Sequence, residues 1–248
     1  MLVDAKSSPA YEIAELSLLQ GKTWRYLRYL HFRDYLQRVS NEISTVCVCG
    51  SGYGLAEFLL AIEFPHINFT LTDIVDRKHG YPNYFQAMKL CWDHEVNNVD
   101  FYVWNVLTPT TRRFDLVAST EMLEHIADDK SAAKNMTLAS NRFVYCLVPY
   151  ADRATNADTA RRKRVWEKFE HYVCGYDPED LTRLFPEPLY MAGAYWHDQG
   201  LKWRLEMKDM EADEITSKRS ELIENAKYDL IDSLPNSSAD CLGIKVLA

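Results

Sequence analysis

Short apolar runs alternate with helical segments through the middle of the chain, and this alternation constrains the fold more than any other feature. The expected strands cover residues 45–49, 68–73, 99–106, 114–119 and 142–149. The expected helices between them cover residues 55–62, 83–96 and 128–139. Strands that alternate with helices form right-handed βαβ crossovers, which build a parallel sheet with helices on both faces. The run from Phe143 to Val148 is apolar at nearly every position, which is typical of a strand buried on both sides.

Helices are expected before this core, and a more polar region follows it. Residues 11–39 show helical periodicity with a break near Gly21, and 151–172 are polar and basic before a short helix at 177–185. Two further strands are expected at 189–196 and 241–247, separated by a helical insertion at 199–239. We therefore predict one α/β domain with a Rossmann-like, seven-stranded, mostly parallel sheet.

Charge and composition narrow the range of partners. The chain of 248 residues has a formal net charge of −8, and a negative surface repels phosphate backbones, so nucleic acid is not expected as a partner. The basic run Arg161–Arg164 is expected to be a solvated helix face. No stretch of about 18 apolar residues is present, and no basic segment followed by an apolar one precedes Ala10. We expect a cytoplasmic protein without membrane contact.

The cysteines are interpreted as free thiols rather than as metal ligands. They are spread along the chain, and several fall in strand-like runs, as expected for buried thiols in a reducing compartment. Cys47 and Cys49 form C-x-C with no partner pair nearby, so no metal site is predicted.

A glycine-rich turn follows the first predicted strand and precedes a helix. The sequence continues from Cys49 as Gly50-Ser51-Gly52-Tyr53-Gly54, and Asp73 ends the second predicted strand 21 residues after Gly52. Such turns let a ligand approach the backbone, and an acid at that place can accept both hydroxyls of a ribose. A dinucleotide turn has its third small residue five positions after the first glycine. Here that position is Leu55, which disfavours a nicotinamide cofactor.

The segment from Phe114 to Ile126 reads Phe-Asp-Leu-Val-Ala-Ser-Thr-Glu-Met-Leu-Glu-His-Ile. Together with the glycine turn, it resembles the class I S-adenosylmethionine-dependent methyltransferases of the small-molecule type, over residues 44–150. The resemblance implies S-adenosylmethionine as the cofactor. It also implies a helical lid or cap at 1–43, a cofactor-binding core at 44–150 and a substrate-side half at 151–248.

The resemblance also implies which residues hold the cofactor. Gly50, Ser51, Gly52 and Gly54 would line its methionine end, and Asp73, followed by Ile74, would hold the ribose. Asn105 would lie near the adenine amine, with Val106 beside the ring; a purely local turn role for Asn105 is the alternative. The residues expected to face the cofactor after the fourth strand are Thr120, Glu121 and Met122. The family usually has an acid two residues before the first glycine, and here that position is Val48.

His171 is the candidate catalytic base, because an imidazole can take a proton from a hydroxyl near neutral pH. A surface loop position is the alternative for it. His125 is expected to pack locally, and Tyr150, Trp196 and His197 are weaker candidates. The aromatic residues of the N-terminal helices could cover the cofactor, but core packing is favoured: Tyr11, Trp24, Tyr26 and Tyr29.

The expected activity is methyl transfer to a small-molecule acceptor, with O-methylation favoured. The Asn-Pro-Pro-Tyr signature of many nucleic-acid and protein N-methyltransferases is absent after the fourth strand. One alternative is a catalytically silent partner protein, suggested by Val48 and by the amphipathic insertion, which could form a homodimer surface. A nicotinamide-dependent oxidoreductase is the other.

Overall fold

The computed structural model describes residues 8–21, 24–78, 80–186, 189–195, 206–207, 209–226, 229–231 and 240–247. The chain divides into two compact units made of separate stretches of sequence. The first unit contains Met1–Thr45, Ser51–Val103 and Trp196–Asp229. The second contains Val46–Gly50, Trp104–Tyr195 and Leu230–Ala248.

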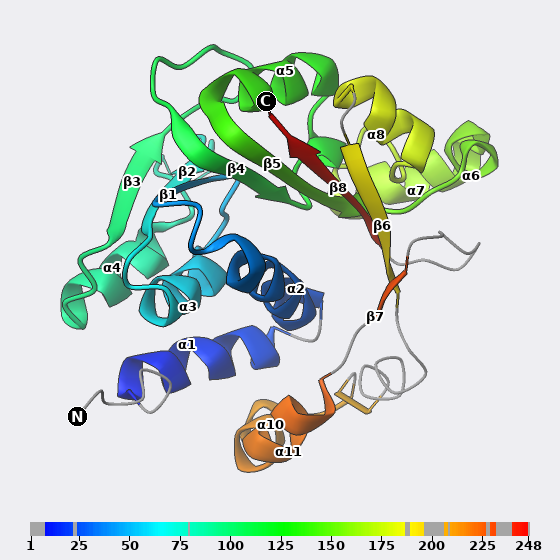
Figure 1. Cartoon of the computed structure of the whole chain (residues 1–248). Helices are drawn as coiled ribbons and strands as arrows, with labels where there is room; N and C mark the ends of the chain where they lie inside the picture. The colour runs from blue at the N-terminus through cyan, green and yellow to red at the C-terminus, as the bar shows by residue number, and fades with distance from the viewer. Residues whose placement is uncertain are drawn as a thin grey trace. The chain divides into compact units, whose positions relative to one another are not determined.

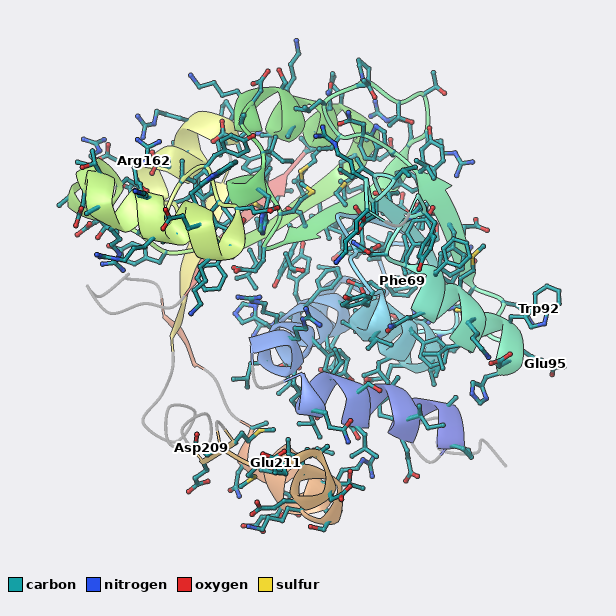
Figure 2. The ribbon with its side chains drawn as sticks, turned by 180° about the vertical axis from the view of Figure 1, so that it is seen from behind. Phe69, Trp92, Glu95, Arg162, Asp209 and Glu211 are labelled. Atoms are coloured by element: carbon teal, nitrogen blue, oxygen red, sulfur yellow. The ribbon has the colours of Figure 1, made fainter. Side chains whose placement is uncertain are left out.

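The first unit is built from helices around two parallel strands. Its helices are α1 (Pro9–Gln20), α2 (Trp24–Val39), α3 (Leu55–Glu63) and α4 (Phe85–Asp93). Strand β2 (Asn68–Asp73) pairs in parallel with β3 (Val99–Val103). At the far end of α4, Trp92 is 87% exposed and projects away from the helix (Figure 2).

Buried tyrosines join the N-terminal helices to α3. The Tyr11 hydroxyl lies 2.6 Å from that of Tyr29, and both hydroxyls donate to the Glu63 carboxylate. Tyr26 is also buried and donates to Glu15. Core packing is therefore confirmed for these three tyrosines, while the side chain of Trp24 lies outside the described residues.

The predicted helical insertion contributes α10 (Ala212–Ser217) and α11 (Arg219–Asn225) to the first unit. Helix α10 packs against α1. Ile215 and Leu222 are buried, and the Arg219 guanidinium pairs with the nearly buried carboxylate of Glu15. Part of the apolar face that suggested a homodimer surface is thus covered within the same chain. Much of the rest of 199–239 lies outside the described residues.

The second unit holds a mixed β-sheet. Strand β4 (Phe114–Thr120) pairs in parallel with β1 (Thr45–Cys49) on one side and with β5 (Ser140–Pro149) on the other. Strand β8 (Asp240–Val246) then lies antiparallel to both β5 and β6 (Leu189–Tyr195), between them (Figure 1). The α/β class and the mostly parallel pairing of the core strands agree with the prediction.

Seven strands are not confirmed, because the described residues include an additional short strand, β7 (Asp229–Ile231), next to β6 in the strand order. The third strand also ends earlier than predicted, at Val103 rather than at residue 106. The carbonyl and side chain of Asn105 accept hydrogen bonds from Thr108 and Leu107, which turns the backbone out of the strand.

Five helical segments follow β4 among the described residues of the second unit. They are the 3-10 turn η2 (Leu123–His125) and the helices α5 (Asp129–Ala139), α6 (Arg153–Ala157), α7 (Thr159–Phe169) and α8 (Pro178–Leu184). Asp152 and Asp158 accept bonds from the first free N–H groups of α6 and α7, which explains why this polar stretch is helical. The basic run lies on α7, which buries no residue, and Arg162 marks it in Figure 2. The solvated face predicted for this run is confirmed.

The cysteines that the structure describes are free. Cys47, Cys49, Cys91 and Cys146 are buried and Cys174 is half-buried. The side chain of Cys241 lies outside the described residues. Among the helices that the structure describes, none is both long and apolar enough to cross a bilayer.

Glu57 is a carboxylic acid buried in the first turn of α3, and we expect it to make stability depend on pH. Burial raises the pKa of Glu57 to about 7 from its ordinary value of 4.5, so the folded protein keeps this proton to higher pH than the unfolded chain does. The resulting stabilisation is present below about pH 4.5 and is lost as pH rises through about 7. Neutral Glu57→Gln should raise the free energy of unfolding by about 2 kcal/mol at pH 8 and change it little at pH 4.5.

Urea unfolding of both proteins at the two pH values measures this difference. Glu224 in α11 is exposed, so the control variant Glu224→Gln should leave the free energy of unfolding unchanged at both pH values. An equal gain for Glu57→Gln at both pH values would contradict the assignment.

Candidate functional site

In the first unit, the glycine turn is tied to the end of β2 by hydrogen bonds. The Ser51 N–H donates to the carbonyl of Thr72 over 3.0 Å, and the Gly52 N–H donates to Oδ2 of Asp73 over 3.1 Å. The motif and the acid that sequence spacing associated with it are therefore in direct contact.

The glycines of this turn differ in their surroundings. Gly52 and Gly54 have positive φ angles of 54° and 69°. A Cβ atom at Gly54 would lie 2.6 Å from Leu71 Cδ2 and 2.7 Å from Ala87 Cβ, whereas a Cβ atom at Gly52 would have no atom within 4 Å. Gly54 is thus required for packing of α3, and Gly52 has open space beside its backbone.

Asp73 ends β2 with its carboxylate held by the backbone. Oδ1 accepts from the Ile74 N–H over 2.8 Å, and Oδ2 accepts from Gly52. Burial raises the pKa of Asp73, against the lowering effect of these two bonds. Each carboxylate oxygen can accept two hydrogen bonds, so the group keeps capacity for ligand hydroxyls. Ile74 beside it is 54% exposed.

Tyr84, which sequence reasoning did not single out, also lies in the electrostatic environment of Asp73. It precedes α4 and packs against Phe101, with ring centroids 5.2 Å apart. Burial and the charge of Asp73 raise the pKa of Tyr84. No motif in the sequence marks this residue, since it follows Asp73 through an irregular loop.

In the second unit, Gly50 is in contact with the segment after β4. Gly50 has a φ of 66°, and a Cβ atom there would lie 2.7 Å from Met122 Cγ. Thr120 ends β4 opposite Leu147, and Glu121 donates its N–H to the Leu147 carbonyl over 2.8 Å with a φ of 53°. The structure therefore brings Gly50 and Met122, two of the residues assigned to the cofactor, next to each other.

Asn105 and Val106 have local structural roles in this unit. The Asn105 side-chain oxygen accepts from the Leu107 N–H over 3.0 Å, and Asn105 is exposed. Val106 is buried, and its carbonyl accepts from the Asn135 side chain over 2.8 Å. These contacts match the local alternative for Asn105, and its role at the adenine stays a prediction.

His171 lies beside His125 and Glu124. The two imidazole rings meet edge to face with centroids 4.4 Å apart, and Phe169 lies 5.4 Å from the His171 ring. The Tyr172 N–H donates to the Glu124 carbonyl over 2.7 Å, which fastens this loop to η2. The Glu124 side chain is fully buried, and burial lowers the pKa of His125 against a raising hydrogen bond to the Glu170 backbone.

Sequence reasoning did not find this cluster as a whole. The sequence marks His171 as a candidate base and predicts local packing for His125, but it does not connect them with Glu124, because 45 residues lie between the two histidines and no motif links them. Of the weaker candidates, Tyr150 forms a backbone bridge with Tyr176, and Trp196 and His197 lie outside the described residues.

The sequence matches no protein-family model and no curated protein. Solved structures do resemble it. Phosphoethanolamine N-methyltransferase 2 from Haemonchus contortus, in complex with S-adenosyl-L-methionine, gives a TM-score of 0.59 at 11% identity. That alignment covers 98% of this chain but 58% of the other, so this chain spans little more than half of that enzyme.

Two smaller enzymes are similar over more of their length. Coclaurine N-methyltransferase, bound to N-methylheliamine and SAH, gives a TM-score of 0.57 at 11% identity over 96% of this chain and 79% of that one. Magnesium protoporphyrin IX methyltransferase from Synechocystis, with bound SAH, gives a TM-score of 0.56 at 11% identity. That alignment covers 90% of this chain and 85% of that one. At this identity the likeness establishes architecture alone. The chain has the fold of the class I S-adenosylmethionine-dependent methyltransferases.

Proposed function

We propose that the chain binds S-adenosylmethionine and transfers its methyl group to a small-molecule acceptor. The observation that carries the proposal is the contact between the glycine turn and Asp73, through the hydrogen bond from Gly52 to the carboxylate. Both parts of the nucleotide motif are present in one local structure, in a chain whose fold neighbours are methyltransferases.

The residues present fit such a cofactor. Open space beside Gly52 lets a ligand approach the backbone, and Asp73 can accept from two ribose hydroxyls. The exposed Ile74 offers an apolar surface to an aromatic base. The other residues assigned to the cofactor are Gly50, Ser51, Gly54, Asn105, Val106, Thr120, Glu121 and Met122.

Bound S-adenosylmethionine supplies a methyl group on a positively charged sulfur, which is open to attack by a nucleophile. The task of the protein is to align the acceptor, exclude water and remove a proton where the acceptor is a hydroxyl. We assign the removal of this proton to His171, and we favour O-methylation. The half of the chain from 151 to 248 would bind the acceptor, because loops beyond the carboxyl ends of parallel strands form the binding face of such sheets.

Release of S-adenosylhomocysteine from S-adenosylmethionine, measured against panels of phenols, carboxylic acids and amines, tests the proposal. We expect turnover with at least one hydroxyl or carboxyl acceptor and about a 100-fold lower kcat in His171→Asn, the size typical of a lost general base. Cofactor binding without turnover of any acceptor would count against catalysis, and turnover of amines alone would contradict O-methylation.

A catalytically silent, cofactor-binding partner protein is the second candidate. Val48 is buried within β1 and pairs with Ala118, at the position where the resembling family usually has an acid. A buried valine cannot hold the amino group of a methionine. Catalysis requires another group to align the methionine end of the cofactor, whereas a silent partner protein needs no such alignment and tolerates weaker binding.

A further inference from the structure

Three side chains with metal-binding atoms lie together in the second unit: Glu124, His125 and His171. A carboxylate oxygen and one nitrogen from each imidazole all lie within 4.8 Å of one another. Glu124 and His125 belong to the turn η2 directly after β4, and His171 comes from the loop after α7. Two segments far apart in sequence thus deliver one nitrogen–oxygen donor set.

The backbone holds this arrangement from both sides. The Tyr172 N–H donates to the Glu124 carbonyl over 2.7 Å, next to His171 in the chain. Glu170 ends α7 with a left-handed φ of 58°, which turns the chain sharply before His171. Glu121, just before η2, has a φ of 53°. A non-glycine residue in this conformation costs about 1 kcal/mol or more, and such costs concentrate at functional sites.

The carboxyl group of the cluster is shielded from solvent. Glu124 is fully buried, a position where carboxylates are rare unless they are paired or bind an ion.

We propose that Glu124, His125 and His171 form a binding site for a divalent transition-metal ion, with Zn²⁺ and Mn²⁺ as the best candidates. Two imidazole nitrogens and one carboxylate oxygen suit these ions, whereas Mg²⁺ and Ca²⁺ prefer sets of oxygen ligands. Ligands at about 2.1 Å from one ion lie up to about 4 Å apart, so the present spacing needs only a small closure of the side chains. Three protein ligands leave a position open for water or another oxygen.

The consequence for the acceptor rests on the proposed function. The cluster directly follows the residues Thr120 to Met122 that we assign to the cofactor. With the ion bound, His171 would be a ligand rather than the base, and the ion would bind the acceptor oxygen and lower the pKa of its hydroxyl, whose proton would pass to water. This favours acceptors with a hydroxyl beside a second oxygen donor. Metal binding itself does not depend on methyl transfer and is measured without the cofactor.

The test uses the full chain after treatment with a chelator and removal of that chelator. Calorimetric titration with ZnCl₂ and with MnCl₂ should show one site per chain for at least one of the ions. His171→Asn and Glu124→Gln should each weaken that binding at least tenfold. His94→Asn removes an exposed histidine at the end of α4 and should bind the ion as the unaltered protein does.

Circular dichroism of each variant separates loss of the site from loss of the fold. Should Glu124→Gln not fold, His171→Asn decides the matter, because His171 lies in a loop and is half-buried. Absence of a stoichiometric site for both ions, or equal binding in His171→Asn and His94→Asn, would overturn the proposal. A separate titration with S-adenosylhomocysteine, in the presence of chelator, reports on the cofactor site independently of the metal.

Discussion

Replacing Asp73 by alanine is expected to weaken binding of S-adenosylhomocysteine by about 100-fold or more. Hydrogen bonds to a charged group contribute about 1.5–3 kcal/mol each, two ribose hydroxyls would lose their acceptor, and 1.4 kcal/mol corresponds to a factor of ten. The substitution also removes the acceptor for the Gly52 N–H, so the glycine turn would lose its connection to the end of β2. Isothermal titration calorimetry measures the change directly.

The matched control is Asp100→Ala, which removes the same charge from an exposed position on β3. It should leave the affinity within a factor of about two, because charges farther apart than a Debye length are largely screened. The affinity of Asp73→Asn should lie between those of the two alanine variants, since an amide oxygen can still accept a hydrogen bond from one hydroxyl but lacks the charge. Equal affinities for Asp73→Ala and Asp100→Ala would contradict the role of Asp73.

Gly54→Ala is expected to lower the free energy of unfolding by about 3 kcal/mol, from overpacking of about 1–3 kcal/mol and a left-handed backbone cost of about 1 kcal/mol. A Cβ atom at this position would overlap Leu71 in β2 and Ala87 in α4, which must both shift. For a chain of this length, that loss corresponds to a fall in Tm of about 6–12 °C. Chemical and thermal unfolding, followed by circular dichroism, measure both quantities.

Gly52→Ala is the matched control for Gly54→Ala. Both positions have a positive φ, but a Cβ atom at Gly52 meets nothing within 4 Å. We therefore expect it to cost only about 1 kcal/mol, the cost of the backbone conformation alone. A loss at Gly54 no larger than that at Gly52 would show that the overlap with Leu71 and Ala87 is relieved at no cost.

The parts of the fold that could be predicted are those governed by local pattern. Strands 45–49 and 68–73 have the predicted bounds, because apolar β-rich runs end there at a glycine turn and at an acid. The break between α1 and α2 near Gly21 is also predicted, because the glycine interrupts the helical pattern there. The contact between Gly52 and Asp73 also follows from local order, since Gly52 lies in the turn after one strand and Asp73 ends the next strand of the same βαβ unit.

Other features depend on contacts that no local pattern encodes. The two helices α6 and α7 form in a polar stretch without an apolar stripe, so hydrophobic periodicity did not reveal them. The early end of β3 results from the turn that Asn105 makes with its neighbours. The side chain of Asn105 had two plausible roles, and spacing alone could not choose between them.

The Glu124 cluster is the clearest example of such a contact. His125 was expected to pack locally, which is what a common family motif suggests for it. Its position beside His171 depends on how the loop after α7 returns to η2, and that return rests on the backbone bond from Tyr172 to Glu124. No property of the separate segments predicts this contact.

Calorimetric titration of the purified chain with S-adenosylhomocysteine tests the central claim most directly. We expect one site per chain with a dissociation constant in the micromolar range, which corresponds to a binding free energy of about −8 kcal/mol. NADH, titrated in the same way, should show no binding, because the turn places its third glycine at Gly54 rather than at residue 55. No binding of S-adenosylhomocysteine to well-folded protein would contradict the account and would show that the chain has this fold without its cofactor site.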